Sequence, residues 1–127
     1  MKHLRSPLSQ VKGLGSAKEG TDHFWLQRLT ALALIPLLLW LCFSVAALPS
    51  MSQEEVRLWM AKPTSAVLLV LFLIAAFYHA KLGLQMVIED YVGNHATRTA
   101  AIILVTFACI LLAVIGIFSV LRVTLGG

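Results

Sequence analysis

The sequence predicts an all-α membrane protein with three transmembrane helices, and three observations lead to this prediction. Of the 127 residues, 59% are hydrophobic and 13% are charged, whereas soluble domains are about 45–50% apolar and about 25% charged. The apolar residues gather in three long segments separated by short polar stretches. A chain this small has too little interior to bury so much apolar surface. We therefore expect the excess apolar surface to face lipid or partner subunits.

The first apolar segment, residues 29–48, carries no charge, and it is long enough to cross a hydrocarbon core of about 30 Å. Thr30 and Pro36 are tolerable inside it, because neighbouring helices can satisfy the backbone groups that a proline frees. We predict a helix over residues 26–48. A short polar loop is then expected at residues 50–62.

The second and third apolar segments follow the same pattern. Pro63 suits the first position of a helix, where its missing N–H costs nothing, and Lys81 is the first charge after it. We predict helices over residues 63–90 and 98–122. The third segment is long enough to span a membrane with some tilt.

Positive charge gathers at the start of the chain, which carries a net charge of +4. Beside a membrane segment such a cluster is typical of an orientation signal rather than of a nucleic-acid site, so we expect no nucleic-acid partner. Residues 1–22 lack apolar periodicity and are predicted to form a cytoplasmic N-terminal arm before a membrane anchor domain at residues 23–127. These charges predict a multi-pass membrane protein with its N-terminus in the cytoplasm.

The end of the second segment carries the candidate site. His79 and Asp90 are eleven residues apart, and at about 100° per residue they return to within roughly 20° of one helix face. The rise between them is about 16 Å, or half of a hydrocarbon core. Gly83 and Met86 fall on the same stripe. One face therefore carries an imidazole at depth, a position without a side chain, and a carboxylate at the membrane edge.

His79 has three possible roles on residue chemistry alone. An ionisable side chain within a membrane segment is costly and is a functional candidate by default. Neutral imidazole is a standard axial ligand of haem iron, and Gly83, one turn on, would let a flat macrocycle lie close to the backbone. A structural hydrogen bond and proton transfer are the alternatives. Because one histidine lies at depth, a haem with two histidine ligands would need its second ligand from another chain.

Three further residues each have a structural and a functional interpretation. Asp90 and Tyr91 are typical of any polar helix end at a membrane surface, but a phenol can also donate a hydrogen bond to a quinone carbonyl while a carboxylate carries protons. Arg28 precedes the first apolar segment. It can anchor that helix to headgroups, or its guanidinium can pair with a haem propionate or a quinone oxygen.

These residues coincide with a known family. The run His-Ala-Lys-Leu-Gly at 79–83, followed by Val-Ile-Glu-Asp-Tyr-Val at 87–92, closely resembles the second helix of the hydrophobic membrane anchors of succinate dehydrogenase. The runs at residues 15–20 and 25–30 are also similar to those anchors in their alphaproteobacterial form. The resemblance covers residues 15–121, and its most specific part is the histidine with Asp-Tyr eleven and twelve residues later.

The resemblance implies a place in the heteromeric helix bundle of complex II in the bacterial inner membrane, with a respiratory function linked to the tricarboxylic acid cycle. The anchor would pair with a second, cytochrome b556-type anchor, hold one shared haem b, and dock an iron–sulfur subunit and a flavoprotein subunit. Succinate chemistry would reside on those other subunits, so this chain is expected to be non-catalytic alone. His79 would be the axial ligand of the haem iron, with Arg28 and Gly83 also at the haem. Tyr91 and Asp90 would bind ubiquinone as substrate.

Two alternatives remain from the sequence. The anchor of a quinol:fumarate reductase uses similar parts, with electrons running in the opposite direction. A membrane scaffold protein without cofactors belongs to a different class, and it would purify with neither a haem absorbance band nor a flavoprotein.

Overall fold

The computed structural model describes residues 17–126, which form four helices with short connections. Three are long: α2 (Ala17–Ala46), α4 (Pro63–Tyr91) and α5 (His95–Thr124). A short helix, α3 (Gln53–Ala61), joins α2 to α4. Each of the three long helices contains a segment apolar enough to cross a membrane, which confirms the predicted all-α fold with three spans. The first sixteen residues of the predicted arm lie outside the described residues.

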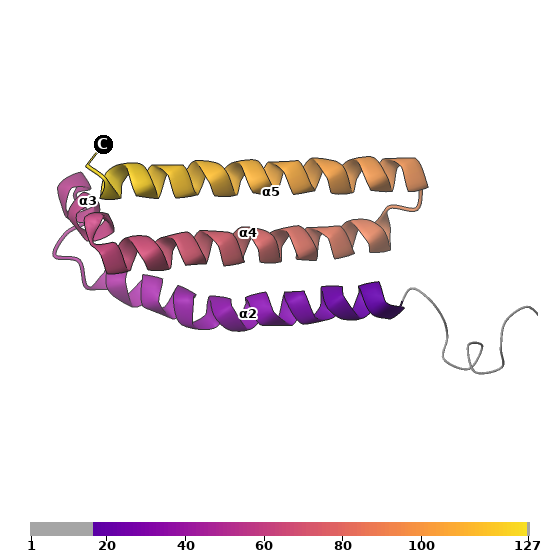
Figure 1. The fold of residues 1–127 in the computed structure, drawn as a ribbon, viewed down its shortest axis with the longest axis horizontal. Helices are drawn as coiled ribbons and strands as arrows, with labels where there is room; N and C mark the ends of the chain where they lie inside the picture. The colour runs from indigo at the N-terminus through magenta and orange to yellow at the C-terminus, as the bar shows by residue number, and fades with distance from the viewer. Residues whose placement is uncertain (1–16, 127) are drawn as a thin grey trace, which may run out of the picture.

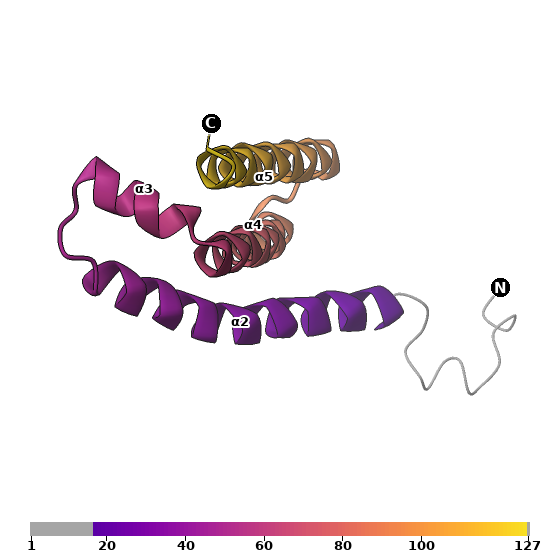
Figure 2. The same ribbon diagram turned by 60° about the vertical axis from the view of Figure 1, so that its left-hand side comes forward.

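Helix α4 is the central element of the bundle. It packs against α2 on one side and α5 on the other, whereas α2 and α5 do not pack on each other within residues 17–126. Figure 1 shows the three long helices side by side, with the start of α2 and the α4–α5 connection at the same end. Figure 2 shows that α2 crosses the α4–α5 pair obliquely. The opposite end of the bundle carries α3 and the C-terminus.

The residues expected to form a polar loop between the first two spans are instead largely helical, so the loop prediction at residues 50–62 is wrong. Ser52 is the N-cap of α3, and its hydroxyl accepts a hydrogen bond from the backbone N–H of Glu55 at 3.3 Å. A serine with glutamate three residues later is the sequence pattern of a capping box. Glu54 and Glu55 also lie in the first turn, where carboxylates offset the positive end of the helix dipole.

The ends of the long helices differ from the predicted ranges, most of all in α2, which begins at Ala17 rather than at residue 26 and ends at Ala46 rather than at residue 48. Helix α5 begins at His95 rather than at residue 98, because the Asn94 side chain caps it by accepting from the N–H of Thr97 at 3.2 Å. Helix α4 extends through Tyr91, so the connection to α5 consists of residues 92–94. Asp90, at the predicted end of the helix, and Tyr91, one residue beyond it, both belong to the last turn of α4.

Few side chains are buried within this chain. The buried apolar residues in the described part are Ala66, Leu82, Cys109 and Val120, all on α4 or α5. The α4–α5 contact is close at Gly116, where an added Cβ would meet Leu73 Cδ1 at 3.1 Å. The lateral faces of all three spans are left uncovered by the chain itself. Lipid or other subunits must cover them, because so much apolar surface cannot face water.

Candidate functional site

His79 lies on the side of α4 that contacts α2, and it is half-buried there. Its Nδ1 atom is 3.0 Å from the hydroxyl oxygen of Thr30 on α2. Within the described residues the other ring nitrogen, Nε2, has no hydrogen-bond partner. A structural hydrogen bond and a ligand role were alternatives on sequence alone, but the imidazole has two nitrogens, so the bond to Thr30 still leaves one free to bind a ligand.

The predicted stripe along α4 depends on an unbroken helix, and α4 is continuous from Pro63 to Tyr91. His79, Gly83 and Asp90 therefore keep the angular relation expected from the helical repeat. Open space lies beside Gly83, because an added Cβ would meet no heavy atom within 4 Å. The haem interpretation needs a free imidazole nitrogen and an unobstructed stretch of backbone one turn away. His79 provides the nitrogen, and Gly83 provides the unobstructed backbone.

His79 is not part of a cluster of metal-binding side chains in the described residues. Residues 17–126 contain no cluster of three or more His, Cys, Asp or Glu side chains that could hold a metal ion. A bare zinc ion takes four ligands, whereas haem iron already has four from its macrocycle and needs only axial ones from protein. The donor set near His79 is therefore compatible with a haem and incompatible with a bare metal ion held by these residues alone.

Tyr91 and Asp90 end α4 on the outside of the molecule. The Tyr91 side chain is 84% exposed, and Asp90 is exposed as well. Neither side chain has a hydrogen-bond or ion-pair partner within residues 17–126. Any enclosed site at these two residues therefore needs walls from another molecule.

Arg98 fixes the position of this helix end, and the sequence interpretation gave it no role there. Its Nε donates to the Val92 carbonyl at 2.9 Å, and its Nη2 donates to the Gly93 carbonyl at 3.2 Å. Carbonyls at the end of a helix lack intrahelical donors. Arg98 satisfies acceptors in the α4–α5 turn and so holds the last turn of α4 in a defined direction.

Arg28 is exposed on α2, and its guanidinium carbon lies 5.2 Å from the ring centroid of Phe24. This is a cation–π contact within one helix, between residues four apart. In the described part of the chain the guanidinium has no carboxylate partner. The structure thus leaves its charge available and does not bring it into contact with His79.

A polar stripe on α2 was not recognised from the sequence. His23, Gln27 and Thr30 follow helical spacing and are all half-buried. His23 Nε2 is buried without a hydrogen-bond partner in the described residues, and so is the Oε1 atom of Gln85 on α4. Because Thr30 meets His79 and the two helices run in opposite directions, His23 and Gln85 lie at a similar level, nearer the α4–α5 turn.

Comparison with known proteins identifies the family. The family model described as "Succinate dehydrogenase/Fumarate reductase transmembrane subunit" matches residues 2–117. The chain belongs to this family.

Relatives named as succinate dehydrogenase hydrophobic membrane anchor subunits agree with it. The one from Rickettsia bellii (strain RML369-C) is 37% identical over 118 residues, covering 92% of this chain and 94% of its own length. The one from Rickettsia conorii (strain ATCC VR-613 / Malish 7) is 34% identical over 108 residues, covering 84% and 86% respectively. The one from Paracoccus denitrificans is 31% identical over 121 residues, covering 95% and 93%. The resemblance drawn from the motifs is therefore confirmed.

As a member of this family, the chain is a multi-pass membrane anchor subunit of succinate dehydrogenase, an oxidoreductase complex. An anchor subunit works together with the other subunits of that complex. The uncovered lateral faces of α2, α4 and α5 are the surfaces that remain for these contacts and for lipid.

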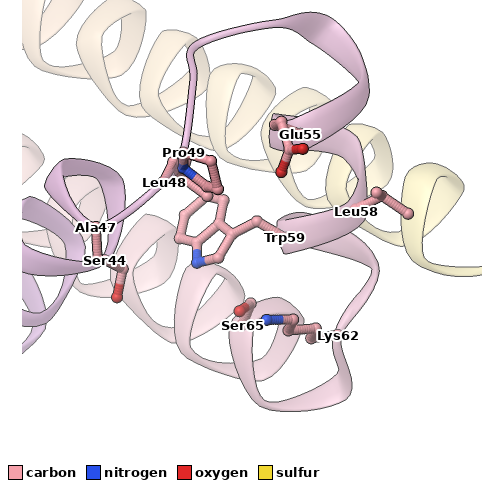
Figure 3. A pocket seen from close by; sticks show the side chains of 9 residues that line it. All are labelled: Ser44, Ala47, Leu48, Pro49, Glu55, Leu58, Trp59, Lys62 and Ser65. Carbon is pink, nitrogen blue, oxygen red and sulfur yellow. The ribbon is translucent and has the colours of Figure 1, made fainter.

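Two hollows of this anchor lie away from Tyr91. One, of about 540 Å³, lies at the α3 end and is lined in part by Ser44, Glu55, Trp59, Lys62 and Ser65 (Figure 3). It is therefore at the opposite end of the bundle from Asp90 and Tyr91.

The second hollow, of about 350 Å³, lies between α4 and α5 and includes Lys81 and Cys109 in its lining. Lys81 thus faces α5 while His79 faces α2, as expected from the angle of about 200° between them on a helix.

Proposed function

We propose that this anchor subunit holds haem b through His79, jointly with a second anchor subunit of the cytochrome b556 type. We further propose that Tyr91 and Asp90 form part of a ubiquinone-reduction site. Electrons from succinate would reach that site through the flavoprotein and iron–sulfur subunits. The observation that carries the proposal is the free Nε2 of His79 on the same unbroken helix as the exposed Asp90 and Tyr91.

On the haem side, His79 Nε2 would offer its lone pair to the haem iron, and a second protein ligand would have to come from the partner anchor. Haem b, when bound, supplies a one-electron redox centre at depth in the membrane. Gly83 presents no side chain, so the face of α4 one turn from His79 can be approached closely. Arg28, two residues before Thr30 on α2, carries a positive charge without a carboxylate partner in the described residues, which suits a propionate carboxylate.

On the quinone side, the Tyr91 phenol donates a hydrogen bond to a carbonyl of the substrate and holds it at the end of α4. Asp90 stands beside it in the sequence, exposed to water, where its carboxylate can take up and release protons. Arg98 keeps the helix end in place through the turn carbonyls. The high exposure of Tyr91 supports a site that is completed by other subunits.

Orientation follows from the same assignment. The start of α2, the α4–α5 turn and Tyr91 share one end of the bundle (Figure 1). Placing the N-terminus in the cytoplasm of a bacterium, as the basic residues favour, puts Tyr91 at the cytoplasmic surface of the inner membrane. Soluble subunits that oxidise succinate would dock on that side.

The family model includes fumarate reductase subunits, but the three relatives described above are all named for succinate dehydrogenase. We therefore propose the direction from succinate to quinone. Succinate:quinone reductase and quinol:fumarate reductase activities of the purified complex, compared at matched quinone potentials, test this direction. A faster quinol:fumarate reaction would reverse it.

The haem assignment is tested with His79→Ala and the control His95→Ala in the complex purified in mild detergent. His95 is an exposed residue at the start of α5. The reduced-minus-oxidised spectrum should lose or shift its haem bands in the first variant and keep them in the second. An unchanged spectrum in His79→Ala would show that the ligand lies elsewhere.

The quinone assignment is tested with Tyr91→Phe and the control Tyr78→Phe, which alters a tyrosine in the middle of α4. We expect quinone reduction to slow about tenfold in the first variant, the size of one lost hydrogen bond of about 1.4 kcal/mol. Succinate oxidation with an artificial electron acceptor should stay the same in both. Equal loss of both activities in Tyr91→Phe would contradict a role confined to quinone.

A further inference from the structure

The hydroxyl of Thr30 has three polar neighbours. Its oxygen lies 2.9 Å from the carbonyl oxygen of Leu26, 3.0 Å from that of Gln27 and 3.0 Å from His79 Nδ1. A hydroxyl has one hydrogen to donate and two lone pairs that accept. The two carbonyl oxygens can only accept, whereas His79 Nδ1 can accept or donate, so the single hydroxyl hydrogen is directed either at the carbonyls or at Nδ1.

The position of that hydrogen determines which nitrogen of His79 is protonated. With its hydrogen directed at the carbonyls, the Thr30 oxygen turns a lone pair towards His79, and Nδ1 must then carry a hydrogen and donate it. The opposite arrangement would point the hydroxyl at Nδ1 and leave its lone pairs facing two carbonyl oxygens, which repel them. In an environment of low dielectric constant that repulsion is strong. The geometry therefore favours Nδ1–H.

We infer that Thr30 is a positioning residue, which fixes His79 in the Nδ1–H tautomer and so presents the bare Nε2 lone pair for iron ligation. A neutral imidazole has one N–H, so a hydrogen on Nδ1 leaves none on Nε2. Histidines that bind metals commonly donate a hydrogen bond from the N–H of their second ring nitrogen. This bond sets the ring orientation and makes the metal-binding nitrogen a stronger ligand. This inference rests on the proposed haem function of His79.

The bond also joins two helices. Thr30 is on α2 and His79 is on α4, so the rotation of the imidazole about its side-chain bonds depends on how α2 packs against α4. The hydroxyl is itself held against its own helix by the carbonyls of Leu26 and Gln27. A fixed acceptor on a second helix orients the ring more firmly than a mobile side chain on the same helix could.

The chain offers a matched control for Thr30. Thr106 on α5 is also half-buried, and its hydroxyl donates to the carbonyl of Ile102 at 2.7 Å. No histidine contacts the Thr106 hydroxyl in the described residues. Replacing either threonine by valine keeps the shape of the side chain and removes one backbone-bonded hydroxyl from a membrane helix. Only the Thr30 change removes an acceptor from His79.

The test uses the complete complex with Thr30→Val, Thr30→Ser and Thr106→Val. The readouts are haem content, the haem midpoint potential and the electron paramagnetic resonance spectrum of the oxidised haem. A hydrogen bond from Nδ1–H makes Nε2 a stronger donor, which favours ferric over ferrous iron. We expect Thr30→Val to raise the midpoint potential by ~59 mV, which corresponds to a tenfold change in that preference for a one-electron couple. Thr30→Ser and Thr106→Val should match the parent complex.

Three outcomes would overturn the inference. The first is a Thr30→Val complex with parental haem content, potential and resonance spectrum, since the hydroxyl would then have no effect on His79. The second is a change of the same size in Thr106→Val, which would assign the effect to the helix backbone. The third is a Thr30→Ser complex that behaves like Thr30→Val, which would show that the hydroxyl is not the active group. Failure of the haem proposal is recognised separately, because the parent complex would then lack haem or His79→Ala would keep the parent spectrum.

Discussion

Replacing Gly83 by alanine should separate the stability of this anchor from the haem binding that we propose for it. A Cβ at this position meets no heavy atom within 4 Å in the chain. Alanine is better than glycine inside a helix by about 1 kcal/mol, so the substitution should stabilise the chain itself by that amount. In the complex, a macrocycle lying beside His79 would meet the new methyl group. Haem content should therefore fall although the fold is intact.

Gly116 gives the opposite case and serves as the control. A Cβ there would lie 3.1 and 3.3 Å from Leu73 Cδ1 and Cδ2. Overpacking of this kind costs about 1–3 kcal/mol, and the gain in helix propensity offsets about 1 kcal/mol of it. Gly116→Ala should thus lower the free energy of unfolding by about 0–2 kcal/mol. Because Gly116 is on α5 and faces α4, its haem content should stay at the parent level.

Two measurements distinguish these variants. Unfolding of the chain in mixed detergent–dodecyl sulfate micelles, followed by circular dichroism, reports the free energy of unfolding. The reduced-minus-oxidised absorbance per complex reports haem content. A Gly83→Ala complex with full haem content and an unaltered spectrum would refute a macrocycle beside Gly83. If Gly83→Ala lowered the free energy of unfolding as much as Gly116→Ala does, the space beside Gly83 would not be open.

Three other substitutions test the packing, the turn and the cap. Leu82 is 2% exposed, whereas Leu84 is 46% exposed. In the same unfolding assay, Leu82→Ala should lower the free energy of unfolding by about 2–5 kcal/mol, and Leu84→Ala should change it little. Arg98→Ala should destabilise the α4–α5 turn by about 1.5–3 kcal/mol, which would appear as faster amide hydrogen exchange at residues 92–94. Replacing the exposed Arg122 by alanine should leave exchange at these residues unchanged. Ser52→Ala should cost about 1 kcal/mol and speed exchange in α3 alone; protection that persists there would show that packing, rather than the cap, holds α3.

The three spans could be predicted from the sequence because their signal is local. An uncharged apolar segment long enough to cross a bilayer has few structural alternatives, and all three were found. Helix α3 was missed because it is only nine residues long and three of them are charged. The Ser52–Glu55 capping pair was the available signal. The start of α5 depended on a cap at Asn94, which composition alone does not reveal.

The candidate site divides in the same way. His79, Asp90 and Gly83 share a stripe of one helix, so the helical repeat alone relates them. The contact between His79 and Thr30 joins residues 49 positions apart, and it depends on the register between α2 and α4. No local pattern contains that register. The same applies to the turn carbonyls held by Arg98, since its orientation follows from the backbone of residues 92–94.

The short helix α3 gives the bundle an asymmetry along its length. It packs on α4 and α5, Trp59 stacks on Trp40 of α2 with ring centroids 5.8 Å apart, and the Thr124 hydroxyl of α5 lies 3.3 Å from the Met60 carbonyl. The contacts of α3 therefore hold the three long helices together at this end. At the other end, where Tyr91 lies, residues 92–94 and Arg98 hold α4 and α5 together, but within residues 17–126 no corresponding element joins α2 to them. An adjacent protein of the complex can therefore shift the start of α2 without separating the helices at the α3 end.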